Sequence, residues 1–496
     1  MRHIVAMFAL APLLVAVPAS GASASAAHTA AASLQDRVLA RLSQAATGTR
    51  FGLVVAAEDG RELVAISPDD RFIPASNTKM FTTAAGMAFL PGIGQPDAGG
   101  GAAVSLESSK RGATDIVLIG NGDARLSSTA ECVTDCLAAL ADAVAAKTRR
   151  VNDIIGDDTL FPVQRWSPGM SWNNIPSGDG TGVSALTLDD NRVVLRITPA
   201  VPDEAPKVEL SAPYFEVENR AVTVASGKTD LEVTRLPFER KVRLLGTIVA
   251  GTDSAIENLG IDDPAHYAAW RLKALLAERG VKVRGEIRTR HRPFDVTDDP
   301  KKRDPAAPTG PAAAEAEPLA RLTPLPLAED IVTINKISQN LHAELMLRRV
   351  GLVRGTGSIE DGQAMVQSML ASAGVPRTGF DFSDGSGMST YNRVAPRAAV
   401  KFLRWVAAQP WGAAWRASLP IAGFDGTLRN RFKGTSLQGR LFAKTGTLNA
   451  TRALSGYMIA KSGQTLTFSM FANDEPSETS ARDTMDAALE LVANEN

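Results

Sequence analysis

Apolar residues along this chain alternate between a helical spacing and short uninterrupted runs. Apolar positions three or four apart predict helices over residues 33–42, 264–278, 326–350, 360–373, 395–408 and 480–493. Short apolar runs predict strands at 51–57, 62–66, 441–443, 454–460 and 465–472, the first two joined at the typical hairpin turn Asp59-Gly60. Another helix is expected to begin near Ser76.

In the middle of the chain the predicted elements change from a mixture of helices and strands to mostly strands. Strand-like runs at 115–119, 152–156, 192–198, 215–224, 230–234 and 241–249 dominate there, with one expected helix at 129–147. We therefore expect one mixed α/β domain formed by residues 27–91 and 262–496, split by a β-rich insertion at 92–261. Residues 292–320, rich in Pro, Ala, Asp and Lys, predict a flexible loop within the second segment.

The N-terminal segment has the layout of a secretory signal peptide. Arg2 and His3 precede an apolar run at 4–19, and small residues follow to Ala27. We expect residues 1–26 to be removed and the protein to be exported. Pro12 and Pro18 and the short run disfavour the alternative, an uncleaved membrane anchor, and no later stretch approaches the roughly 20 apolar residues of a membrane span.

Composition narrows the function classes. The chain has 53 Lys and Arg against 54 Asp and Glu, a balance that argues against a nucleic-acid partner. The five histidines form no HExxH motif, so we expect no metal and no cofactor. Cys132 and Cys136 are spaced to share one face of the expected helix, which leaves open either a disulfide or two small side chains on one face.

Three short motifs carry candidate chemistry. In the first, Ser76 and Lys79 are three apart at a helix start, so the amine can reach the hydroxyl and act as its base. Alone this motif is weak, because a serine N-cap followed by a surface lysine has the same spacing. The second, Ser338-Gln339-Asn340, offers a hydroxyl and an amide, but it is also an ordinary helix N-cap sequence.

The third motif is Lys444-Thr445-Gly446-Thr447, in or at the end of an expected strand. Its amine and hydroxyls suit a carboxylate, Gly446 allows close approach of a ligand to the backbone, and the Thr447 N–H could contribute to an oxyanion hole. The alternative is a polar strand end. The order of all three motifs in one exported chain is the set expected of β-lactamases and penicillin-binding proteins.

Two other features favour structural roles. Asp384-Gly-Ser-Gly387 predicts a tight turn and only secondarily a wall of the site. His342 is a lone histidine on an expected helix, more consistent with a structural residue than a base. A Ser-His-Asp triad is disfavoured because the chain has no Gly-x-Ser-x-Gly motif and few histidines.

The chain resembles the class C low-molecular-mass penicillin-binding proteins, which are D-alanyl-D-alanine carboxypeptidase/endopeptidases of the penicillin-binding protein 4 type. Matching stretches run through the whole mature chain. They are Pro74–Ala85, Gly120–Asp123, Gly156–Asp158, Ser184–Leu186, Asn335–Asn340 with Ala343 and Glu344, Asp384–Ser389, Gly426–Leu428, Ala443–Leu448 and Ala453–Tyr457. The gap of about 260 residues between Ser76 and Ser338 is also a family trait, and single-domain β-lactamases keep these motifs closer.

The resemblance implies a serine transpeptidase/β-lactamase-like α/β fold, an antiparallel sheet flanked by helices, with β-rich inserted domains. It implies peptidoglycan stem peptides as substrates, β-lactam antibiotics as covalent inhibitors, and a periplasmic or cell-wall location. Two alternatives stay open: a β-lactamase or esterase on the same scaffold, and a non-catalytic peptidoglycan-binding scaffold.

The implied roles fall on the residues of the three motifs. Ser76 would form an acyl-enzyme with the penultimate D-Ala, Lys79 would be its base and Ser338 would relay a proton. Asn340 would hold either Lys79 or the substrate amide. The terminal carboxylate would be bound by Lys444, Thr445, Gly446 and Thr447, and the oxyanion by the N–H groups of Ser76 and Thr447.

The chain departs from the family pattern in three places. Thr390 stands where relatives often have Arg, and Ser171–Ile175 and Gly178–Gly182 replace a stretch that is often aromatic. The loop at 292–320 is longer than usual. The first two departures bear on selectivity for the peptide side chain rather than on the core chemistry.

Overall fold

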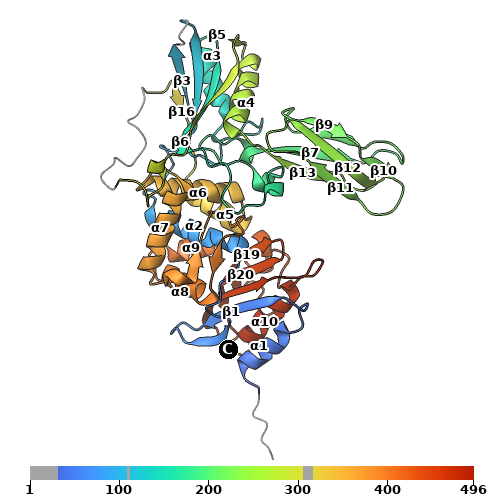
Figure 1. Cartoon of the computed structure of the whole chain (residues 1–496), viewed down its shortest axis with the longest axis vertical. Helices are drawn as coiled ribbons and strands as arrows, with labels where there is room; N and C mark the ends of the chain where they lie inside the picture. Colours follow the sequence, from blue (N-terminus) through green and yellow to red (C-terminus); the bar gives the residue numbers. More distant parts are fainter. Residues whose placement is uncertain (1–31, 109–111, 305–316) are drawn as a thin grey trace, which may run out of the picture.

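The computed structural model describes residues 32–108, 112–304 and 317–496, so the signal peptide expected at 1–26 lies outside the described residues. The described chain is elongated (Figure 1). Its first and last segments lie together at one end, where α1 (Leu34–Leu42) packs beside α10 (Arg482–Asn494). The middle of the chain forms the other end and a lateral arm.

One antiparallel sheet joins the two ends of the chain. Its strand order is β19-β20-β21-β1-β2. The strands are β1 (Arg50–Ala56), β2 (Glu62–Ile66), β19 (Leu441–Leu448), β20 (Thr451–Ile459) and β21 (Thr465–Asn473). The expected fold class, an antiparallel sheet flanked by helices, is therefore confirmed.

Strand β1 explains why this sheet has continuous apolar runs in its sequence. Leu53 and Val55 belong to the core beneath α1 and α10, whereas Val54 and Ala56 pack with Val400 on α8 (Pro396–Ala407). Both faces are covered, so neither set of alternating positions is polar. The other helices on the α8 side are α2 (Thr78–Phe89), α5 (Leu327–Lys336), α6 (Asn340–Leu352), α7 (Ile359–Ser372) and α9 (Gly412–Ala417).

The single helix expected at 326–350 is wrong, because the structure has two helices there. α5 ends at Lys336, whose ammonium donates to the Leu419 carbonyl at 2.7 Å. Ser338 then adopts a left-handed backbone with φ +65°, and the Gln339 side chain caps α6 by accepting from the Leu341 N–H at 3.0 Å. The break turns Ser338 out of the helix.

The inserted part contains a second five-stranded sheet, ordered β15-β6-β4-β3-β16, with α3 and α4 packed on it. The elements are β3 (Ala103–Ser108), β4 (Thr114–Ile119), α3 (Leu137–Lys147), β6 (Ile154–Pro162), α4 (Pro264–Glu278), β15 (Ile287–Arg292) and β16 (Ala320–Arg321). A short parallel pair, β5 (Arg150–Val151) and β14 (Lys282–Val283), adjoins it. Because α4, β15 and β16 follow residue 261, we propose that the insertion continues to Arg321.

The lateral arm consists of two small sheets. One is ordered β13-β7-β8, and in the other β12 pairs with β9, β10 and β11. Their strands are β7 (Arg192–Thr198), β8 (Lys207–Leu210), β9 (Glu216–Asn219), β10 (Val222–Val224), β11 (Asp230–Thr234), β12 (Lys241–Val249) and β13 (Ala255–Gly260). The single strand expected at 215–224 is wrong: the Asn219 side chain accepts from the Ala221 N–H at 3.1 Å, and this turn separates β9 from β10.

The cysteine pair lies in a loop rather than on a helix. α3 begins at Leu137 instead of near residue 129, so the expected sharing of one helix face is wrong. Asp135 adopts φ +58° next to the pair, which is incompatible with a continuing helix. Cys132 and Cys136 are joined by a disulfide in this loop.

The described part of the segment 292–320 is anchored, in contrast with the flexible loop expected. The carboxylate of Asp298, fully buried, accepts from Arg292 at 2.7 Å and from the Thr356 hydroxyl at 2.6 Å. Arg303 donates twice to Asp361, at 2.8 Å each. Residues 305–316 of this segment lie outside the described residues.

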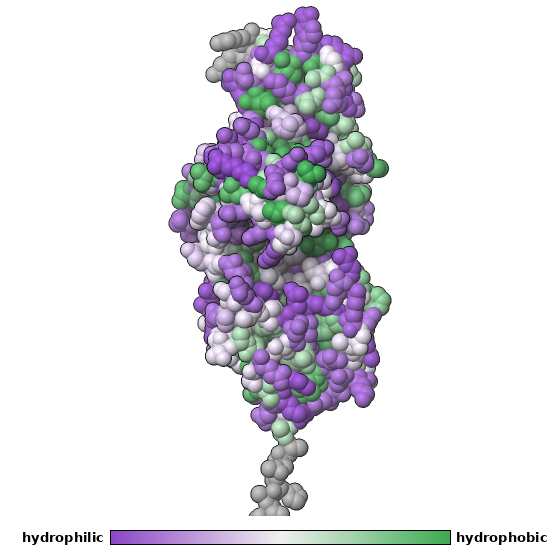
Figure 2. All heavy atoms as spheres, turned by 90° about the vertical axis from the view of Figure 1, so that its right-hand side faces the viewer, coloured by the Kyte–Doolittle hydropathy of each residue, from purple (hydrophilic) through white to green (hydrophobic). Residues whose placement is uncertain are grey.

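The described residues include no helix that is both long and apolar enough to cross a membrane. On the face shown in Figure 2, hydrophobic residues are scattered among hydrophilic ones and do not gather into one large patch.

Candidate active site

Ser76 lies in a strained turn immediately before a helix. It is the middle residue of a 3-10 turn, Ala75–Asn77, which leads into α2. Ala75 adopts φ +47°, and two glycines leave room for it. A Cβ on Gly387 would meet the Ala75 carbonyl oxygen at 1.9 Å, and one on Gly446 would meet the Pro74 carbonyl oxygen at 2.6 Å. The absence of a side chain at Gly446 therefore allows the backbone of Pro74 to pack against β19.

Lys79 lies one turn further along, fully buried beneath Ser76. Its Nζ lies at hydrogen-bond distance, 2.9 Å, from Ser76 Oγ, and it donates to Asn340 Oδ1 at 2.7 Å and to the Ser386 carbonyl oxygen at 2.6 Å. Burial lowers the pKa of Lys79 to about 8, although the carboxylates of Asp384, Glu344 and Asp179 act in the opposite direction. The amine is thus in contact with the hydroxyl, and a minority of it is neutral at physiological pH.

Two buried carboxylates hold the loop that presents the Ser386 carbonyl. Glu344 accepts from the N–H groups of Gly385 and Ser386, at 3.1 and 2.8 Å. Asp384 accepts from the Gly387 N–H at 2.9 Å and from two further donors. Burial, followed by the charge of Asp384, raises the pKa of Glu344 to about 7. The stretch 384–387 is thus a turn, as expected, and it also fixes a contact of Lys79.

Lys444 approaches from the edge strand β19. Its buried ammonium donates to Ser338 Oγ at 2.9 Å and to the Thr445 carbonyl at 3.0 Å. Burial, and then the charge of Lys79, lower the pKa of Lys444 well below its ordinary value. The next side chain, Thr445, donates to Thr427 Oγ1 at 2.7 Å. The third motif therefore lies within a strand and contacts the second.

These side chains meet at a cleft of about 430 Å³. Its wall contains six of the residues singled out by the sequence: Ser76, Ser338, Asn340, Thr445, Gly446 and Thr447. Lys79 and Lys444 lie directly beneath, bonded to the serines. The wall also carries three arginines, Arg431, Arg452 and Arg482. Arg431 is paired with Asp486, and Arg452 lies 3.7 Å from Glu475. The cleft therefore presents a nucleophile and two lysine amines, a combination suited to a substrate that ends in a carboxylate.

The inserted part contributes Asp179, which our reading of the sequence missed. Its backbone carbonyl accepts from Asn340 Nδ2 at 3.0 Å, so the amide of Asn340 is held from both sides. The Ser386 carbonyl was missed too. Both contacts use main-chain oxygens, which cannot be predicted from residue type, although both residues lie in stretches that the sequence analysis mentions, Gly178–Gly182 and Asp384–Gly387.

His342 and Thr390 connect the inserted part with the domain that carries Ser76. His342 lies between Asp330 and Asp190, with nitrogen–oxygen distances of 3.1 and 3.0 Å, which confirms a structural role. The Thr390 hydroxyl donates to the Gly169 carbonyl at 3.0 Å. Thr390 thus holds a neighbouring loop.

Comparisons with known proteins agree with this geometry. The model of the D-Ala-D-Ala carboxypeptidase 3 (S13) family matches residues 34–300 and 305–495. A D-alanyl-D-alanine carboxypeptidase from Actinomadura sp. (strain R39) is 32% identical over 440 residues, which are 85% of this chain and 77% of that protein.

The fold is also similar to solved structures. Penicillin binding protein 4 (dacB) from Haemophilus influenzae superposes with a TM-score of 0.76 and 20% identity over 92% of this chain and 98% of that one. The same protein complexed with a β-lactam gives a TM-score of 0.73 and 19% identity over 92% and 99% of the two chains.

The chain belongs to the S13 family of D-Ala-D-Ala carboxypeptidases, a family of serine peptidases. It is thus a hydrolase of the carboxypeptidase class, with the architecture of penicillin binding protein 4.

Proposed function

We propose that this protein is a D-Ala-D-Ala carboxypeptidase that acts through an acyl-enzyme on Ser76. One observation carries the proposal: Lys79 Nζ contacts Ser76 Oγ and two oxygens that can only accept, Asn340 Oδ1 and the Ser386 carbonyl. A neutral amine has two N–H groups and one lone pair. The two acceptors take the N–H groups, so the lone pair is left for the proton of Ser76.

In the proposed reaction Ser76 Oγ loses its proton to Lys79 and attacks the carbonyl of the penultimate D-Ala. The N–H groups of Ser76 and Thr447 stabilise the oxyanion. The C–N bond then breaks, and Ser338, which Lys444 orients, relays a proton to the departing amine of the terminal D-Ala. Water hydrolyses the resulting ester and restores the Ser76 hydroxyl.

Burial disfavours the charged form of Lys444 in the free site, and binding of the substrate opposes this effect. A terminal carboxylate beside Lys444 favours its protonated form, and the hydroxyls of Thr445 and Thr447 donate to the same group. The same chemistry cleaves a peptide crosslink when the leaving amine belongs to a second stem peptide, so DD-endopeptidase activity is included in the proposal. β-Lactams, which present a carboxylate and a reactive carbonyl together, are the expected covalent inhibitors.

The proposed place of action is the cell-wall space outside the cytoplasmic membrane. The signal-like segment at 1–26 and the presence of a disulfide between Cys132 and Cys136 both support export. The substrate, peptidoglycan, lies in that compartment.

The first experiment is labelling with a reporter penicillin followed by mass spectrometry of the peptide that contains Ser76. We expect a stable adduct in the wild type and in Ser462→Ala, a control at an exposed turn, but none in Ser76→Ala. Absence of an adduct on folded wild type contradicts the proposal. Rapid turnover of a chromogenic cephalosporin would instead support a β-lactamase. Mass spectrometry of purified muropeptides then separates loss of terminal D-Ala from cleavage of crosslinks.

A further inference from the structure

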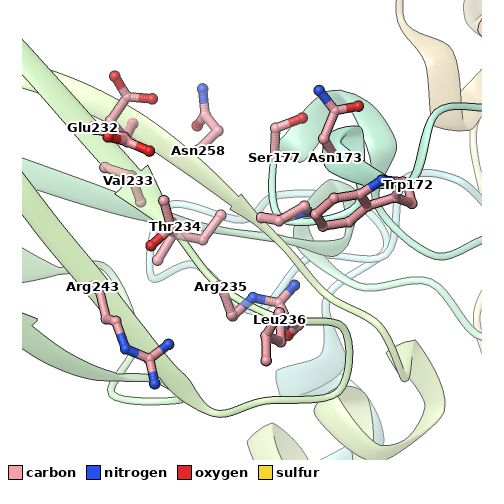
Figure 3. A pocket seen from close by; sticks show the side chains of 13 residues that line it. Trp172, Asn173, Ser177, Glu232, Val233, Thr234, Arg235, Leu236, Arg243 and Asn258 are labelled. Atoms are coloured by element: carbon pink, nitrogen blue, oxygen red, sulfur yellow. The ribbon is translucent and has the colours of Figure 1, made fainter.

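A second cavity, of about 400 Å³, lies in the lateral arm and is separate from the cleft at Ser76. It is lined by the segment 172–177, by β11 and the two residues that follow it, and by β13. In Figure 3 the indole of Trp172 lies at one end of this arm cavity and Glu232 at the other, with Asn258 between them.

The most unusual feature of the arm cavity is its exposed aromatic residue. Trp172 is 65% exposed, and the neighbouring Leu236 is 58% exposed. Neither side chain contributes to a core. A flat indole face in contact with water suits a ligand that has both an apolar face and polar edges, as a pyranose ring does.

The polar side chains that line the arm cavity favour a ligand that donates hydrogen bonds. The side chains of Glu232, Glu257 and Asn258 have no hydrogen-bond or ion-pair partner among the described residues. The two arginines of the wall are already compensated, Arg235 by Asp262 at 2.8 Å and Arg243 by Glu239 at 3.0 Å. The free charge in this cavity is negative, which disfavours phosphates and carboxylates and favours hydroxyl and amide N–H groups.

The arm cavity and the cleft are physically connected. Ser177 pairs with Leu259 of β13, and the 3-10 turn Gly178–Gly180 carries Asp179, whose carbonyl accepts from Asn340. Trp172 and Asp179 are only seven positions apart, so their Cα atoms lie within about 25 Å of each other. A stem peptide of about five residues spans about 17 Å when extended. The two sites are therefore joined by one short segment of chain.

We infer that the arm cavity is a glycan subsite, which binds an N-acetylated sugar of the strand whose stem peptide occupies the cleft. The inference rests on the proposed function, because it takes the cleft to hold that peptide. The sugar stacks on Trp172, and its hydroxyl and acetamido N–H groups donate to Glu232 and Asn258. The protein then recognises its substrate as a glycopeptide, at two positions.

The test compares a free pentapeptide with the same pentapeptide linked to its disaccharide. We expect the wild type to show a kcat/KM about tenfold higher for the linked substrate, the effect of one aromatic anchor. Trp172→Ala lowers the kcat/KM for the linked substrate to that for the free pentapeptide and so removes this preference. Phe294→Ala, which removes another exposed aromatic residue outside both cavities, keeps the preference.

Binding of the glycan is measured separately from catalysis, so that failure of the glycan subsite can be distinguished from failure of the proposed reaction. The inactive Ser76→Ala variant is titrated by calorimetry with glycan strands stripped of peptide, and again after adding Trp172→Ala. Heat that depends on Trp172 supports the subsite even if no substrate is cleaved. The inference is overturned if the glycan does not bind, if the wild type has no preference, if Trp172→Ala slows both substrates equally, or if an amine-bearing peptide binds this cavity instead.

Discussion

The ammonium of Lys444 donates to the hydroxyl of Ser338 across 2.9 Å, and Ser338 holds this position in a left-handed backbone conformation, with φ +65°. The two residues come from different elements, the edge strand β19 and the break between α5 and α6. A residue with a Cβ is destabilised in this region, so the backbone conformation of Ser338 lowers local stability.

Two substitutions at Ser338 distinguish the role of its hydroxyl in turnover from the effect of its backbone conformation on stability. Both Ser338→Ala and Ser338→Gly remove the proposed relay, so both should lose most of the turnover of a D-Ala-D-Ala peptide. Only glycine relieves the left-handed conformation, so Ser338→Gly should be more stable than Ser338→Ala by about 1 kcal/mol. Urea unfolding measures the difference. Equal midpoints for the two variants would contradict the strain at this residue.

The pH dependence of acylation should follow Lys79. Its pKa, lowered to about 8 by burial, leaves a minority of the amine neutral at pH 7. Because only the neutral amine can accept the proton of Ser76, the limiting acylation rate should rise about tenfold per pH unit below pH 8 and level off above it. Rates are measured at saturating penicillin, so that any pH dependence of penicillin binding at Lys444 does not change the observed rate. A flat profile between about pH 6 and 9 would exclude Lys79 as the base.

The sequence located the side chains of the site but not the main-chain groups that hold them. Ser76 and Lys79 are one helical turn apart, so their contact follows from local spacing alone. The carbonyls of Ser386 and Asp179 could not be found in this way, because every residue has a carbonyl. Their positions depend on a loop fixed by buried carboxylates and on the docking of the inserted part.

Elements of the fold could be predicted where local sequence determines them, but not where they depend on contacts with distant residues. Strands buried on both faces, such as β1, are visible as apolar runs. The break at Ser338 was not predicted, because apolar residues keep a helical spacing on both sides of it, although Ser338-Gln339-Asn340 was noted as an N-cap sequence and Gln339 does cap α6. Strand β15 was missed because three of the six residues in Ile287–Arg292 are arginines and only one is apolar.

Gly387 should be essential to the turn that carries Ser76. An alanine there would place its Cβ 1.9 Å from the Ala75 carbonyl oxygen and would displace the nucleophile. We expect Gly387→Ala to reduce the acylation rate by about a hundredfold, the effect of a displacement of about 1 Å. Gly463→Ala is the matched control, because Gly463 has a similar φ of +92° but no atom within 4 Å of the place that a Cβ would take. It should lose stability without losing acylation, and a comparable loss of acylation in both variants would refute the steric argument.

His342 should make stability depend on pH in the alkaline range. Burial alone would lower its pKa, but the hydrogen bonds to Asp190 and Asp330 outweigh burial and raise the pKa to about 9, from an ordinary value of 6.5. The folded state therefore holds this proton more tightly than the unfolded chain, so the contribution is complete below pH 6.5 and is lost as the pH rises through 9. The shift corresponds to at most about 3 kcal/mol. His291 titrates in the same range, so the measurement is the difference between wild type and His342→Gln in urea unfolding. That difference should shrink between about pH 6 and 10, and a constant difference would mean that His342 is neutral in the folded protein.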